Sequence, residues 1–128
     1  IVSFPMLEHI VLNAGIELYE KKQYAQALEK FNQVIKSEPN NAYAYYYRGM
    51  IYDEQSQPKL AINDYLSVLK NSNEFPIANY MLAVDYDSAA DYKNAFKYYK
   101  LFTEKYTTDD EFLKYAKERM KELESYVG

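Results

Sequence analysis

The sequence predicts an all-α fold of three antiparallel helix pairs followed by a seventh, capping helix. The first observation is a repeat with a period of 34 residues. The second is a shortage of helix breakers, with only 3 Gly and 4 Pro among 128 residues. The third is the helical spacing of apolar residues within each repeat. Together they predict seven helices and no sheet.

The repeat is defined by columns of similar residues that recur in steps of 34 positions. The small-residue columns are Gly15, Gly49 and Ala83, and Ala27, Ala61 and Ala95. The larger columns are Leu18, Tyr52 and Tyr86, then Leu28, Ile62 and Phe96, then Phe31, Tyr65 and Tyr99. They divide the chain into repeats at 8–41, 42–75 and 76–109 and a capping helix at 110–128. We expect residues 1–128 to form a single domain. Because the chain opens with Ile1 instead of Met, we expect this domain to be a fragment of a longer protein.

The first repeat predicts two helices joined by a short turn. Phe4-Pro5 places a proline in the first turn of a helix that runs to about Glu20, with Ser3 or Phe4 as its cap. Lys21-Lys22-Gln23 forms the turn before the second helix. Glu38-Pro39-Asn40-Asn41 ends that helix, because proline disfavours helix in the residue before it.

The later repeats follow the same plan. In the second repeat, a turn at residues 55–57 leads into a helix that opens at Pro58. The third repeat begins at Pro76 and turns near residues 89–91. Asp109-Asp110 then caps a last helix whose polar outer face shields the end of the stack from water, with Lys117 in the column of small residues.

The helix predicted at residues 42–54 is apolar on both sides. One side carries Tyr45, Gly49 and Tyr52 and is expected to pack within the repeat. The opposite side carries Tyr43, Tyr46, Tyr47 and Met50. A helix of this kind is either buried between neighbours or presents its second apolar face to a ligand. We therefore expect that replacing Tyr47 and Met50 leaves the packing within the repeat largely intact.

These columns resemble the tetratricopeptide repeat, a helix-turn-helix with a W-x2-L-G-x2-Y…A-x3-F…P pattern. In the second repeat, Gly49, Ala61 and Tyr65 occupy its small, alanine and aromatic positions. The chain departs from the pattern in having no Trp and in placing Arg48 where leucine is expected, and Pro39 matches the closing proline in the first repeat only. The resemblance implies a right-handed superhelix with the first helix of each pair on its concave side.

Some members of this family bind the C-terminal Glu-Glu-Val-Asp of chaperones through a clamp of Lys, Asn and Arg side chains. The matching positions here hold Leu12, Ile16, Tyr47, Ile77 and Met81. None of these side chains can hold a carboxylate, so the resemblance does not imply that activity.

The positions that the resemblance places on the concave side predict an apolar, Tyr-rich groove that binds a peptide. They are Leu12, Asn13, Ile16, Tyr43, Tyr46, Tyr47, Met50, Ile77, Tyr80, Met81 and Val84. The alternative interpretation is that these residues only pack against the neighbouring repeat. A large contiguous apolar strip is unusual on a monomer without a partner, and Met and Tyr together suit an adaptable binding surface.

Acidic residues near the C-terminal ends of the three first helices predict an acidic edge to this groove. They are Glu20, Asp53, Glu54 and Asp87. A carboxylate there opposes the helix dipole, so helix stability does not account for these residues. We expect them to attract Lys or Arg beside the bound segment, with a contribution to solubility as the alternative.

The expected partner is therefore another protein, bound as a peptide or helical segment, and self-assembly of several copies is the alternative. A net charge of −4 without a basic patch argues against nucleic acid. No apolar run approaches the length of a membrane span, so we do not expect insertion into a membrane. We expect a soluble cytoplasmic protein, with a periplasmic or other extracytoplasmic location as the alternative.

Catalysis has little basis in the sequence. His9 is the only histidine, no nucleophile pattern accompanies it, and the chain has no Cys for thiolate chemistry or disulfides. Asp85, Asp87 and Asp91 suggest a calcium loop but lack its glycine and its bidentate Glu. We expect no enzyme activity, no metal and no cofactor.

Overall fold

The computed structural model describes residues 4–127, with the backbone alone for Phe4 and Pro5, and this part of the chain is all-α. It contains seven helices, which confirms the predicted fold class. They are α1 (Phe4–Glu20), α2 (Tyr24–Ser37), α3 (Ala42–Glu54), α4 (Pro58–Asn71), α5 (Pro76–Ser88), α6 (Tyr92–Lys105) and α7 (Glu111–Val127). Ser3, one of the two caps suggested for the first helix, lies outside the described residues.

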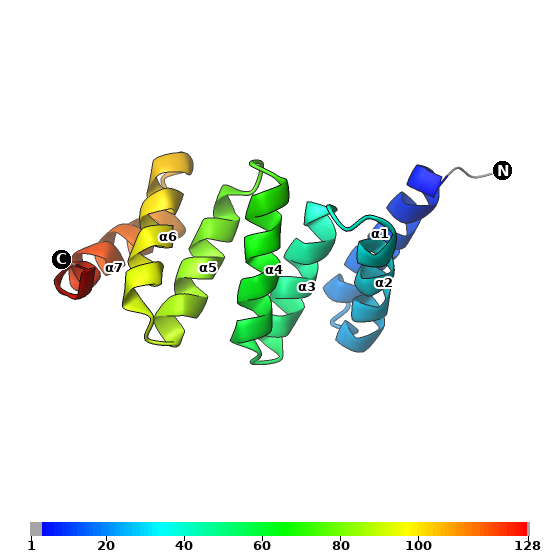
Figure 1. Ribbon diagram of the computed structural model, residues 1–128, viewed down its shortest axis with the longest axis horizontal. Coiled ribbons are helices and arrows are strands. Elements are labelled where there is room, and N and C mark those ends of the chain that lie inside the picture. The colour runs from blue at the N-terminus through cyan, green and yellow to red at the C-terminus, as the bar shows by residue number, and fades with distance from the viewer. Residues whose placement is uncertain (1–3, 128) are drawn as a thin grey trace. The chain divides into compact units, whose positions relative to one another are not determined.

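The chain divides into two compact units, which we call the first unit (residues 1–71) and the second unit (residues 72–128). In the first unit, α1 packs against α2 and α3 packs against α4, while α2 and α1 contact α3 (Figure 1). In the second unit, α6 packs against both α5 and α7. The helices therefore pack pairwise as the repeat predicts.

The columns of small and aromatic residues meet within each helix pair. A Cβ atom added at Gly15 would lie 2.8 Å from Cε1 of Phe31, and one added at Gly49 would lie 2.8 Å from Cε1 of Tyr65. This distance is shorter than a van der Waals contact, so α1 and α3 approach their partners as closely as they do only because both positions lack a side chain. In the second unit the equivalent Ala83 is fully buried in one cluster with Tyr99.

Each unit has its own apolar core. One buried cluster of the first unit comprises Leu12, Ala27, Phe31, Val34, Ala44 and Ile51. A buried cluster of the second unit comprises Ala83, Ala95, Tyr99, Phe102, Leu113, Ala116 and Leu123. Three of these residues belong to α7, while Lys117 on the same helix is exposed. Full burial of a Leu side chain contributes about 1.5–3 kcal/mol, so these residues hold α7 on the core of its unit. The predicted polar outer face is interrupted by the exposed Phe112, Tyr115 and Tyr126.

The three turns inside the helix pairs share one backbone conformation. Lys22, Ser56 and Ala90 have φ angles of 61°, 58° and 61°, the left-handed region that L residues seldom adopt. The amide N–H of the next residue donates to the carbonyl oxygen five residues earlier, at 2.8–2.9 Å in all three turns. This is the Schellman motif, which satisfies the last carbonyl groups of a helix.

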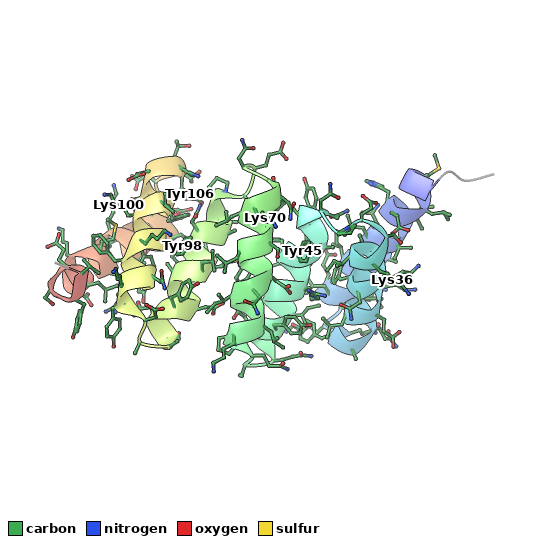
Figure 2. The ribbon with its side chains drawn as sticks, viewed as in Figure 1. Lys36, Tyr45, Lys70, Tyr98, Lys100 and Tyr106 are labelled. Atoms are coloured by element: carbon green, nitrogen blue, oxygen red, sulfur yellow. The ribbon has the colours of Figure 1, made fainter. Side chains whose placement is uncertain are left out.

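Arg48, one of the departures from the family pattern, ties α3 to α4 and to α2. Its guanidinium donates two hydrogen bonds to Asp64 on α4, at 2.9 and 2.7 Å, and one of 2.9 Å to Asn32 on α2. The guanidinium carbon also lies 5.6 Å from the ring centroid of Tyr45 and 5.7 Å from that of Tyr52. Tyr45 is labelled on α3 in Figure 2. Asp64 is only 3% exposed, and this burial raises the pKa of its carboxyl group although the bonds from Arg48 oppose the rise.

Candidate partner-binding surfaces

Side chains of α1 and α3 meet in the first unit, on what we call the α1–α3 surface. We define it as Tyr19, Tyr46, Tyr47 and Met50, which are linked by side-chain contacts, together with Asn13, Ile16 and Tyr43, which the sequence analysis predicts on the same face. The ring of Tyr19 meets that of Tyr47 edge to face at 5.5 Å, and the Tyr19 hydroxyl donates to the Met50 sulfur at 3.8 Å. Tyr46 in turn contacts Tyr47 at 5.6 Å. Tyr19 was not predicted to belong here, yet it connects the two helices.

The members of this surface differ in how far they are covered. Tyr43 is 49% exposed, whereas Leu12, predicted for the groove, is 7% exposed and belongs to the core, so we leave it out of the surface. Tyr47 is half-buried and stacks on the fully buried Phe31, with ring centroids 5.7 Å apart. Phe31 belongs to the first repeat, so replacement of Tyr47 would remove a contact between repeats that the sequence did not reveal. That it leaves the packing within its own repeat largely intact stays a prediction.

Two carboxylates lie beside the aromatic rings of the α1–α3 surface. Burial raises the pKa of the Tyr47 phenol, and the charge of Glu20 raises it further. Burial likewise raises the pKa of Tyr19, and the charge of Glu54 adds to it. Glu20 and Glu54 are both exposed. The surface thus combines neutral phenols with carboxylates that water still reaches.

The other two residues of the predicted acidic edge have partners inside the protein. Asp53 accepts a hydrogen bond of 2.8 Å from the Tyr65 hydroxyl, and Asp87 accepts one of 3.1 Å from Tyr99. Arg119 on α7 also holds both oxygens of Asp87, at 2.8 and 2.7 Å. These bonds between helices give Asp53 and Asp87 a structural role that the argument from the helix dipole did not consider. The attraction of a partner's basic residue stays a prediction for Glu20 and Glu54.

The second unit presents a second aromatic face, which we call the α5–α7 surface. Sequence reasoning placed Ile77, Tyr80, Met81 and Val84 of α5 there, and all four are half-buried. The structure adds Phe112 and Tyr115 of α7, which are 48% and 43% exposed. The ring of Tyr80 lies 5.2 Å from that of Phe112 and 6.2 Å from that of Tyr115, both edge to face. Tyr80 therefore joins the two helices.

The α7 residues were missed because that helix was treated only as a polar cap. The signal was present in their spacing, since Phe112, Tyr115 and Arg119 stand at i, i+3 and i+7 and so share one stripe of a helix. Next to this stripe lies a hollow of about 240 Å³ between α5, α6 and α7. It is lined by Val84, Asp87, Ser88, Tyr99, Tyr115 and Arg119. Burial, followed by the charge of Asp87, raises the pKa of the Tyr99 phenol.

Other kinds of site have little support in the part of the chain that the structure describes. Over residues 4–127, no three His, Asp or Glu side chains gather as metal ligands would. None of the described helices combines the length and apolar character needed to cross a membrane.

A family model described as tetratricopeptide repeat matches residues 12–74, and the seven described helices have the arrangement of solved structures of that family. This chain is a tetratricopeptide-repeat domain. No curated protein matches the domain. Its relation to known proteins therefore rests on the family model and on solved structures.

Three solved structures that resemble the domain contain a bound partner. The type III secretion chaperone SycD of Yersinia enterocolitica, in complex with a peptide of the translocator YopD, has a TM-score of 0.82 and 16% identity, over 98% of each chain. The first TPR of Spaghetti (RPAP3), bound to the HSP90 peptide SRMEEVD, has a TM-score of 0.79 and 13% identity, over 94% of this chain and 92% of that one. The TPR2B domain of yeast Sti1, in its complex with pHsp70, has a TM-score of 0.77 and 16% identity, over 93% and 97%. At such identities the likeness shows the fold alone.

Proposed function

We propose that this tetratricopeptide-repeat domain binds a segment of another protein on the α1–α3 surface, with a Lys or Arg of that segment beside Glu20 and Glu54. The observation that carries the proposal is the meeting of Tyr19, Tyr47 and Met50 on one face next to those two carboxylates. Peptides bound by the structural neighbours support the general class of function.

The aromatic part of the surface supplies the affinity. Tyrosine offers a large, rigid contact area with a polar tip, and Met50 adds an adaptable thioether. Tyr43 is 49% exposed, so a partner can still bury about half of its surface. At the centre of an interface, truncation of an aromatic residue of this kind typically costs about 2 kcal/mol or more of binding energy.

The carboxylates supply selectivity for a basic neighbour. A cation near Glu20 and Glu54 gains Coulomb attraction and contact with the faces of the adjoining tyrosine rings. Because both acids are exposed, the attraction is screened by salt and acts mainly on the rate of association. The positions that match the carboxylate clamp hold apolar or aromatic residues, so an acidic C-terminal tail is not the ligand we propose.

A display library of random peptides, selected against the full chain, tests the proposal directly. We expect the enriched peptides to combine two or more large apolar residues with a flanking Lys or Arg. Tyr43→Ser should weaken their binding roughly tenfold or more, as expected for loss of an interface aromatic. Glu20→Gln with Glu54→Gln should slow association and flatten its salt dependence.

The matched control carries the same charge change elsewhere, in the exposed residues Glu29 of α2 and Glu124 of α7. Glu29→Gln with Glu124→Gln should leave the association rate and its salt dependence unchanged. Selection of acidic or purely polar peptides would contradict the proposal. Sedimentation at several concentrations examines the self-assembly alternative, which requires a concentration-dependent dimer that Tyr43→Ser dissociates.

A further inference from the structure

Arg48 shows how this chain accommodates an arginine beside tyrosine rings. Its guanidinium donates two hydrogen bonds to the Asp64 carboxylate, at 2.9 and 2.7 Å. The guanidinium carbon lies 5.6 Å from the ring centroid of Tyr45 and 5.7 Å from that of Tyr52. One flat cation thus contacts aromatic rings and a carboxylate at the same time, a combination that the planar shape of arginine permits.

Arg119, the only other arginine of the sequence, repeats the carboxylate part of this arrangement. It donates two hydrogen bonds to Asp87, at 2.8 and 2.7 Å. The Tyr99 hydroxyl donates a third hydrogen bond to the same carboxylate, at 3.1 Å. Both arginines of the chain are therefore engaged with an Asp that has a tyrosine close by.

Tyr19 and Glu54 bring a ring and a carboxylate together beside the α1–α3 surface. The Tyr19 hydroxyl donates to the Met50 sulfur at 3.8 Å. Glu54 follows Met50 by four residues, so its side chain lies one turn further along the same face of α3. Burial and then the neighbouring Tyr24 raise the pKa of the Tyr19 phenol, and the charge of Glu54 raises it further. Glu54 is exposed, so its carboxylate is open to a cation from another molecule.

We propose that the basic residue of the bound segment is an arginine, whose guanidinium lies against the Tyr19 ring and donates hydrogen bonds to the Glu54 carboxylate. This inference deepens the proposed function and rests on it, because it names the cation that the segment supplies. The site should prefer arginine to lysine.

The ring of Tyr19 is held in place before a partner arrives. It contacts the Tyr24 ring of α2 with centroids 5.8 Å apart and the Tyr47 ring of α3 at 5.5 Å. Tyr19 is nevertheless only half-buried, so part of its side chain is available for contact. Because neighbours from two other helices already order the ring, little entropy is lost there on binding.

The preference for arginine follows from the shape and hydration of the two cations. A guanidinium is flat and weakly hydrated, so it stacks on an aromatic face and still presents N–H groups to both oxygens of a carboxylate. An ammonium is a compact, strongly hydrated charge on a flexible stem, and its pairing with an exposed carboxylate contributes little. A ring beside a carboxylate therefore suits a guanidinium better than an ammonium.

Three capped tripeptides test the inference without an identified partner. Acetyl-Leu-Arg-Leu-amide, its lysine analogue and its citrulline analogue differ only in the central side chain, and citrulline keeps the flat shape of arginine without the charge. NMR titration of the full chain would follow the methyl signal of Met50 and the ring signals of Tyr19. We expect the arginine peptide to bind about fivefold or more tighter than either analogue.

Two variants, each with a control, assign the preference to the carboxylate and to the ring. Glu54→Gln should weaken binding of the arginine peptide about fivefold or more, because it removes the charged acceptor. Glu29→Gln makes the same charge change at an exposed position of α2 and should leave binding unchanged. Tyr19→Leu should abolish the preference for arginine over lysine, whereas Tyr19→Phe keeps the ring and should retain it. Circular dichroism would show that each variant is folded.

Several outcomes would overturn the inference. Equal or tighter binding of the lysine or citrulline peptide by the parent chain would do so, as would the absence of a saturable shift with the arginine peptide. An affinity for the arginine peptide that Glu54→Gln leaves unchanged would do so as well. Failure of the proposed function looks different, because peptide selection would then yield no apolar peptides with a basic residue. Selected lysine peptides that depend on Tyr43 would support the proposed function and exclude the preference for arginine.

Discussion

The hydroxyl of Tyr65 donates a 2.8 Å hydrogen bond to the carboxylate of Asp53 on the helix before it. Tyr99 and Asp87, each 34 positions later, form the same pair at 3.1 Å. In the first repeat, Phe31 has no hydroxyl and Tyr19 stands where the carboxylate would be. The two positions therefore change together within one chain, because a buried phenol needs an acceptor and a buried ring without a hydroxyl does not.

Tyr65→Phe should destabilise the protein by about 1.5–3 kcal/mol, the range for a hydrogen bond to a charged group. Tyr65 is fully buried, and the variant keeps its ring in place over Gly49. Urea unfolding with an unchanged m-value would measure the loss. Tyr126→Phe, at a site that is 63% exposed, is the control and should change stability by less than about 0.5 kcal/mol. Equal stability of both variants would show that the Asp53 bond adds nothing.

Gly49→Leu should cost about 1–3 kcal/mol or more, because it overpacks the crossing of α3 and α4. Even a Cβ atom at this position would lie 2.8 Å from the Tyr65 ring, so the ring or the helix must shift. Thermal unfolding would show a lowered melting temperature. Ala25→Leu, at an exposed position of α2, adds the same kind of side chain and should be nearly neutral. An unchanged melting temperature for Gly49→Leu would mean that the helix pair is not packed as described.

Arg48→Leu should destabilise the first unit by about 3–5 kcal/mol, because it leaves the Asp64 carboxylate buried without its partner. The side chains of the pair are 20% and 4% exposed, so little water can replace the lost bonds. Burial raises the folded-state pKa of Asp64 above its unfolded value, so protonation favours the folded variant at low pH. The loss measured at pH 7 should therefore shrink as the pH falls towards 4. A double variant with Asp64→Leu should recover much of the stability, and a loss that is independent of pH would contradict this account.

Alkaline pH should destabilise the domain through its buried and half-buried tyrosines. Burial raises the pKa of Tyr46, Tyr80 and Tyr99 in the folded state, whereas the unfolded phenols ionise near pH 10. Their contribution to the free energy of unfolding is therefore complete below pH 10 and is lost as the pH rises further. Each phenol that ionises only in the unfolded state lowers the free energy of unfolding by about 1.4 kcal/mol per pH unit. Urea unfolding between pH 8 and 11 would measure the slope. Tyr99→Phe should make the slope shallower, and an identical slope would exclude Tyr99 as a contributor.

The helices and their pairing could be predicted from the sequence because they depend on local patterns. Pro58 and Pro76 begin helices where a proline costs least, and the contact of Gly49 with Tyr65 follows from two columns of one repeat. The candidate surfaces could be predicted only in part. A helical projection gives the direction of a side chain but not how deeply a neighbouring helix covers it, so Leu12 was placed in the groove although it lies in the core.

Contacts between side chains from different repeats were beyond the sequence. The position of Asp87 in its repeat does not predict that Arg119, 32 residues later, donates hydrogen bonds to both of its carboxylate oxygens. Tyr19 likewise reaches Met50 from another repeat. The residues that break the repeat, Arg48 among them, were recognised as departures, but their partners became visible only with the helices in place.

The left-handed conformation of Lys22, Ser56 and Ala90 has a consequence for protein engineering. A residue with a Cβ atom pays about 1–2 kcal/mol to adopt that conformation, and glycine does not. Glycine substitution at each turn should therefore raise stability. None of the three positions belongs to the α1–α3 or α5–α7 surface. A triple-glycine chain would thus be a more heat-resistant scaffold. Substitutions on the proposed binding surface, such as those at Tyr47, could then be studied in a chain that stays folded.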